Sequence, residues 1–186
     1  MTHTFPWNRR AARLGLAALV LTLAFAPAGC KRKAKVRVQT AEEEAPRMAS
    51  SVSMGDPRSA SQLIAGFYTI EQNSWRWTAR QFTIVLRPPF GAAEKGAALK
   101  MRLTIPDPVI AQIKTVSLTA SVDGHPLPPE TYAKPGQYTF TRDVAASLLT
   151  GESTRIEFQL DKTMAPANGD VRELGIVAQS IGLEPK

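Results

Sequence analysis

The segment LKMRLTI, residues 99–105, alternates apolar and polar side chains along its whole length. A similar alternation recurs in FTIVL at 82–86, TVSLTASV at 115–122 and RIEFQL at 155–160. Because successive side chains of a strand point to opposite faces, this period of two predicts antiparallel strands with one face buried and one in water. Weaker segments that fit the same pattern are 67–71, 75–78, 137–142 and 175–181.

Turn-forming residues separate these segments, and Asp123-Gly124 between Val122 and His125 predicts a tight hairpin. About eight short strands in roughly 120 residues predict an all-β fold, a single antiparallel two-sheet β-sandwich of the jelly-roll or immunoglobulin-like kind. Cys30 is the only cysteine, so the fold has to rest on its hydrophobic core.

Two short helical segments accompany the strands. Asp56 followed by Pro57 is typical of an N-cap and a first helical residue, which predicts one or two helical turns over residues 58–65. A single helical turn is expected over residues 144–149.

The first thirty residues have the layout of an export signal. Arg9, Arg10 and Arg13 precede an apolar run at 14–25, and small residues at 26–29 precede Cys30. The run of twelve residues is too short to cross a bilayer core of about 30 Å as a helix. A cleaved signal is therefore expected.

This segment resembles a bacterial lipoprotein signal peptide. The resemblance implies acylation of Cys30, which would become the first mature residue, and Lys31 after it implies sorting to the outer membrane in a two-membrane cell. Pro27 departs from the aliphatic residue usual at that position. Three alternatives stay open: ordinary cleavage near Ala26 or Ala28 with a free cysteine, a twin-arginine route, and an uncleaved anchor.

Residues 31–57 contain few large apolar side chains, and we expect them to form a flexible tether. Basic residues cluster between Lys31 and Arg37, whereas from residue 38 onward fifteen Lys or Arg face sixteen Asp or Glu, a net charge of −1. The basic character is thus local, which argues against nucleic acid as a partner. It suits either a solvated spacer or contact with anionic lipid.

The first candidate site is Trp75-Arg76-Trp77, in which both indoles would lie on one face of a strand. With Tyr68 they are candidates for stacking on sugar rings. The alternative, which is commoner in a sandwich without disulfides, is that the indoles anchor the core.

The second candidate site is Asp170-Val171-Arg172-Glu173-Leu174-Gly175, directly before the last apolar segment. Its charges could orient a ligand. We favour a structural latch of Asp170, Arg172 and Glu173, with Arg172 held bidentately by a carboxylate at the end of the sheet.

Together these stretches resemble accessory β-sandwich domains that accompany some bacterial glycosyltransferases and surface-polysaccharide proteins, related in shape to carbohydrate-binding modules. The motifs are Gly66-Phe67-Tyr68, Glu71, Trp75 to Thr78 and Asp170 to Gly175, and the resemblance covers about residues 66–183. It implies a sandwich and a glycan context.

Catalysis finds little support in the sequence. The two histidines are His3, which would leave with the signal, and His125, which lies in a turn. Neither a Gly-x-Ser-x-Gly motif nor a His/Cys cluster for a metal occurs, and we expect neither cofactor nor metal. A pair of catalytic carboxylates among Asp107, Asp123, Asp161 and Asp170 stays open.

We therefore expect a signal peptide at 1–29, the lipidated cysteine with a disordered tether at 30–57, and a β-sandwich with a short leading helix at 58–186. The expected function is that of a non-enzymatic binding or assembly module of the cell envelope, held on the membrane through Cys30. Its partner would be an envelope glycan. The alternatives are a scaffold subunit in a protein complex and, more remotely, a glycan-active enzyme.

Overall fold

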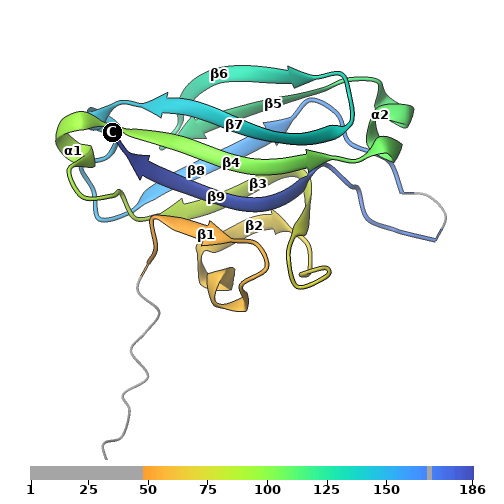
Figure 1. The fold of residues 1–186 in the computed structure, drawn as a ribbon, viewed down its shortest axis with the longest axis horizontal. Coiled ribbons are helices and arrows are strands. Elements are labelled where there is room, and N and C mark those ends of the chain that lie inside the picture. Colours follow the sequence, from red (N-terminus) through yellow and green to blue (C-terminus); the bar gives the residue numbers. More distant parts are fainter. Residues whose placement is uncertain (1–47, 167–168) are drawn as a thin grey trace, which may run out of the picture. The chain divides into compact units, whose positions relative to one another are not determined.

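The computed structural model describes residues 48–166 and 169–186, and these form an all-β sandwich (Figure 1). One sheet has the strand order β7–β4–β9–β1, and the other has the order β6–β5–β8–β3–β2. All strand pairs are antiparallel, as expected. The strands are β1 (Ser51–Ser53), β2 (Leu63–Phe67), β3 (Arg76–Leu86), β4 (Ala97–Ile105), β5 (Val116–Val122), β6 (His125–Tyr132), β7 (Gly136–Val144), β8 (Thr154–Leu160) and β9 (Val177–Pro185).

The alternation read from the sequence sets which face of each strand is buried. In β4, Leu99, Met101, Leu103 and Ile105 are all fully buried, while Arg102 between them is exposed. β5 and β8 follow the same rule, and the hairpin between β5 and β6 turns at Asp123-Gly124, where both residues have positive φ. Such a pair of positive φ values is what a tight type I′ hairpin needs.

Three phenylalanines join the two sheets across the core. Phe158 of β8 stacks on Phe82 of β3 with ring centroids 4.9 Å apart, and Phe140 of β7 meets Phe158 edge-on at 6.4 Å. All three side chains are buried. These rings are the largest fully buried side chains of the described residues.

β3 belongs to both sheets. Residues 75–78 and 82–86 were expected to be separate strands, but one strand runs from Arg76 to Leu86. Arg76 and Trp77 pair with β9 in the first sheet, and residues 81–86 pair with β8 in the second. The exposed pair Arg80-Gln81 interrupts the apolar pattern at the crossing and hid this continuity in the sequence.

The expected tether ends earlier than residue 57. Ser51–Ser53 forms β1, which pairs with Ser180 to Gly182 of β9, and Met54 after it is fully buried. The predicted domain boundary at residue 58 is therefore wrong, because a three-residue strand with one apolar side chain is too short to show a period.

Short helices cap the ends of the strands. The expected leading helix is a 3₁₀-helix, η1 (Pro57–Gln62), and the carboxylate of Asp56 accepts a hydrogen bond from the Arg58 backbone N–H, as predicted for its N-cap. Residues 63–65 belong to β2 and not to that helix. The turn expected near 144–149 is η2 (Ala146–Leu148), whereas α1 (Ala92–Lys95) and α2 (Asp107–Ile113) were not expected.

Two side chains fasten the long edges of the sandwich. Arg142 of β7 donates to the carbonyls of Pro128 and Pro129 and to the carboxylate of Glu130 on β6, which ties one sheet to the other. Gln62 does the same at the opposite edge, where its amide bonds the backbone of Ala49 and Val85. Within the described residues, no helix is long and apolar enough to span a membrane.

Candidate functional site

A tight turn positions Trp75 before β3. The Glu71 N–H donates to the Trp75 carbonyl at 2.9 Å, and the Trp75 N–H donates back to the Glu71 carbonyl at 3.3 Å. Gln72 and Asn73 between them have φ values of 49° and 50°, in the left-handed region. Asn tolerates this conformation better than most residues, so the local sequence supports the turn.

The two indoles meet edge to face. The Trp75 and Trp77 rings have centroids 6.1 Å apart and an interplanar angle of 83°, a favoured aromatic geometry. Both side chains are half-buried, and Trp77 packs against the core. Trp77 is thus held from the side of the core and both indoles retain exposed surface, a position between the two alternatives that the sequence left open.

Arg76, between the two indoles, bonds two neighbouring backbone segments on the other face of β3. Its Nε donates to the Met54 carbonyl at 3.1 Å and its Nη1 to the Tyr68 carbonyl at 2.8 Å. Burial lowers the pKa of Arg76, since desolvation disfavours its charge. The residue thus joins three backbone segments around the start of β3.

Arg172 sits in a fork of two carboxylates. Its Nε and Nη2 bond both oxygens of Asp170 at 2.8–3.2 Å, and its Nη1 donates to Glu71 Oε1 at 2.9 Å. The hydrogen bonds from Arg172 lower the pKa of Asp170 to about 2, and those of both carboxylates raise the pKa of Arg172. This ion triad joins the 68–75 loop to the 161–175 loop.

Tyr68 and Glu173 complete this arrangement. The Tyr68 hydroxyl donates to the Glu173 carbonyl at 2.9 Å, and the guanidinium carbon of Arg172 lies over the Tyr68 ring at 5.3 Å. The Glu173 carboxylate accepts a hydrogen bond from the Thr163 hydroxyl. We call Tyr68, Glu71, Asp170, Arg172 and Glu173 the latch cluster.

The latch cluster places the two predicted constellations next to each other. Glu71 both bonds Arg172 through its side chain and closes the turn of Trp75 through its backbone. Tyr68, predicted as part of the sugar platform, has its hydroxyl and one ring face engaged within the cluster. Glu71 belongs to the motifs of the resemblance but was not predicted as a site residue. Its partner Arg172 lies 101 positions away in the sequence.

Two hollows were not predicted. One, of about 610 Å³, lies at the end of the sandwich beyond β3 and is lined by residues that include Met48, Pro88, Pro89, Leu149 and Glu152. The other, of about 320 Å³, lies on the outward face of β3, β5 and β8, and its polar lining is Gln81, Thr83, Thr119, Ser121, Glu157 and Gln159. The polar positions of β3, β5 and β8 are the sequence signal for the second hollow, whereas no local pattern marks the first.

The remaining candidates are dispersed. His125 is exposed on the β5–β6 hairpin, with its Nδ1 3.2 Å from the carbonyl of Asp123. Asp123 and Asp161 accept backbone hydrogen bonds from Arg155 and Ser117. Among the described residues no group of His, Cys, Asp and Glu could hold a metal. Cys30 lies outside the described part of the chain.

Comparison with known proteins gives similarity at the level of structure. No family model and no curated protein matches the chain. An acetyl xylan esterase (Est2A) from the rumen bacterium Butyrivibrio proteoclasticus is similar over 73% of this chain and 32% of its own, at 9% identity and a TM-score of 0.48. The CBM51-2 and INT domains of Clostridium perfringens ZmpB are similar over 73% of this chain and 28% of theirs, at 16% identity and a TM-score of 0.35.

A CBM36-1 domain of a multidomain xylanase, from the hindgut metagenome of Trinervitermes trinervoides, is similar over 71% of this chain and 94% of its own, at 12% identity and a TM-score of 0.36. The chain thus spans about a third of the length of the first two proteins.

Proposed function

We propose that this chain is a cell-envelope lipoprotein, anchored through an acylated Cys30, whose β-sandwich is a non-enzymatic module that binds envelope glycan. In a two-membrane cell it would sit on the outer membrane and face the periplasm. The observation that carries the glycan proposal is the indole pair Trp75–Trp77, half-buried and braced by the latch cluster.

The chemistry suits a sugar ring. An indole offers a broad apolar face to the C–H groups of a pyranose at a small cost in side-chain entropy. Here the turn that carries Trp75 is closed by Glu71, and Glu71 is bound by Arg172. A site braced before the ligand arrives loses less entropy on binding than one that has to order itself.

Tryptophan fluorescence tests the proposal on the mature protein. The sequence has three tryptophans, Trp7, Trp75 and Trp77, and Trp7 leaves with the proposed signal peptide, so the emission reports on the indole pair alone. The protein is titrated with a panel of envelope polysaccharides in the presence of an aqueous quencher. We expect at least one glycan to shield the pair, and Trp75→Ala to weaken that binding by about two- to tenfold, which corresponds to the energy of an aromatic stacking contact.

Two matched variants locate the site. Phe90→Ala removes an exposed aromatic ring far from the pair and should leave glycan binding unchanged. Gln159→Ala alters the polar hollow on β3, β5 and β8. Binding that depends on Gln159 and not on Trp75 would overturn the assignment to the indoles, and the lack of binding by any glycan would overturn the glycan proposal itself.

The anchor has its own test. Cys30→Ala should abolish incorporation of a labelled fatty acid and release the protein from the membrane fraction. A variant that still carries the label and stays with the membrane would refute anchoring through Cys30.

A further inference from the structure

Phe90 is the most exposed large apolar side chain of the described residues. Its relative accessibility is 103%, as high as in an isolated residue. It follows Pro88 and Pro89 in the loop between β3 and α1, and Gly91 after it has a φ of 77°, in the left-handed region. The two prolines restrict the loop, so the ring is presented to solvent by a stiff support.

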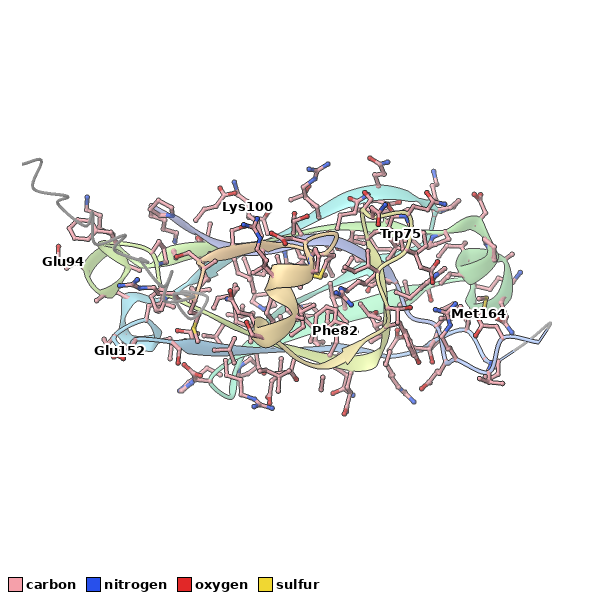
Figure 2. All side chains as sticks on the ribbon, turned by 90° about the horizontal axis from the view of Figure 1, so that it is seen from below. Trp75, Phe82, Glu94, Lys100, Glu152 and Met164 are labelled. Carbon is pink, nitrogen blue, oxygen red and sulfur yellow. The ribbon has the colours of Figure 1, made fainter. Side chains whose placement is uncertain are left out.

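The described chain begins at this same end of the sandwich. Met48, the first described residue, is itself exposed by 37% and lines the hollow of about 610 Å³ together with Pro88 and Pro89. Figure 2 shows Glu94 of α1 and Glu152 of the same hollow at one end of the sandwich, with Trp75 and Met164 toward the other. We call the residues around Phe90, Met48 and α1 the Phe90 end.

The distance between the two ends exceeds the root-mean-square span of a flexible chain as long as the one between Cys30 and Met48. β3 has eleven residues and connects the two ends, which separates them by about 35 Å. Seventeen residues, 31–47, lie between Cys30 and Met48. A flexible chain of that length has a root-mean-square span of about 20–25 Å.

We propose that the Phe90 end faces the membrane and that Phe90 inserts into the interfacial region of the phospholipid bilayer; this rests on the proposed anchoring through Cys30. An aromatic ring at the headgroup level is favourable. Exposed charges near the loop are of both signs, Arg87 and Lys95 against Glu94 and Glu152. The apolar ring therefore orients the domain, while the basic residues between Lys31 and Arg37 attract anionic lipid.

A single attached probe can test the orientation in the intact lipoprotein. Cys30 is the only cysteine and its thiol is blocked when it is acylated, so Glu94→Cys or Val171→Cys supplies the one free thiol. Both positions are exposed, Glu94 at the Phe90 end and Val171 in the latch-cluster loop. Each variant is labelled with the fluorophore NBD and reconstituted into vesicles of phosphatidylethanolamine and phosphatidylglycerol, and dithionite then reduces whichever label water can reach.

We expect the label at position 94 to be reduced roughly fivefold more slowly than the label at position 171, and Phe90→Ser to remove most of that protection. Equal rates at both positions, or protection that survives Phe90→Ser, would overturn the inference. Flotation with the vesicles separates the two proposals. Protein that fails to float refutes the anchor and the orientation with it, whereas protein that floats with equally accessible labels refutes the orientation alone.

Discussion

The two ends of the sandwich are built in opposite ways. At the latch cluster, loops from distant parts of the chain are joined by ion pairs, and even Tyr68 has its hydroxyl bound. At the Phe90 end a hollow is open and a phenylalanine ring projects into solvent. The contrast teaches that contacts within the chain fix the surface of the latch cluster, whereas few contacts cover the Phe90 end. In the orientation proposed above, the membrane covers that end.

The largest expected effect is a loss of stability on substitution in the core, and it tests whether the two ends of the sandwich share that core. Phe158→Ala removes the ring that contacts both Phe82 and Phe140, and it should lower the free energy of unfolding by about 3–5 kcal/mol. In urea, the NBD label at position 94 and hydrogen exchange at the latch cluster should report the same transition. Two separate transitions would show that the ends fold independently and would break the comparison as drawn.

Arg172→Ala should loosen the latch end alone. Removal of the guanidinium leaves Asp170 and Glu71 without their shared partner, and we expect backbone exchange in residues 71–75 and 170–175 to rise roughly five- to tenfold. Hydrogen exchange followed by mass spectrometry measures this. Arg58→Ala is the matched control, because Arg58 makes the same fork with Asp56 but joins no second loop, so its exchange pattern should stay close to that of the parent protein.

Acid should reproduce the effect of Arg172→Ala. The pKa of Asp170 is lowered from 3.8 to about 2, so its contribution is complete above pH 3.8 and is lost as the pH falls through 2. Exchange in the 170–175 segment, corrected for its intrinsic pH dependence, should therefore rise between about pH 4 and pH 2 in the parent protein and stay level in Arg172→Ala. A parallel rise in both proteins would assign the acid sensitivity to another group.

The smallest expected effect is on stability at the Phe90 end. Phe90→Ser removes a side chain that packs against nothing, and it should change the free energy of unfolding by less than about 0.5 kcal/mol. A urea titration of the two proteins checks this. A loss of several times that size would mean that Phe90 supports the fold, and its exposure would then need a structural explanation.

Most strands could be predicted because alternation is a local property. The buried residues of β4, β5 and β8 can be read directly from segments such as 99–105. β1 was missed because Ser51–Ser53 contains one apolar residue and depends on β9 for its place. α2 was missed because Pro106-Asp107-Pro108 has the composition of a turn, although proline within the first helical turn is also favourable.

The candidate site could be predicted only in halves. The sequence Asp170-Val171-Arg172 contains the local ion pair, and Trp75-Arg76-Trp77 places two indoles on one face. What joins them is the bond from Arg172 to Glu71, formed by residues 101 positions apart, and no local pattern encodes such a contact. The exposed ring of Phe90 was equally hidden, since an apolar residue between prolines and glycine shows no period.

The position of β9 has a consequence for the order of events during biosynthesis. This last strand lies between β4 and β1 and also pairs with the start of β3, so it is the centre of its sheet (Figure 1). A nascent chain that lacks residues 177–185 leaves β1 and one edge of β4 unpaired. The first sheet can therefore complete its pairing only after residues 177–185 have emerged, and until then β1 and β4 lack the strand that joins them.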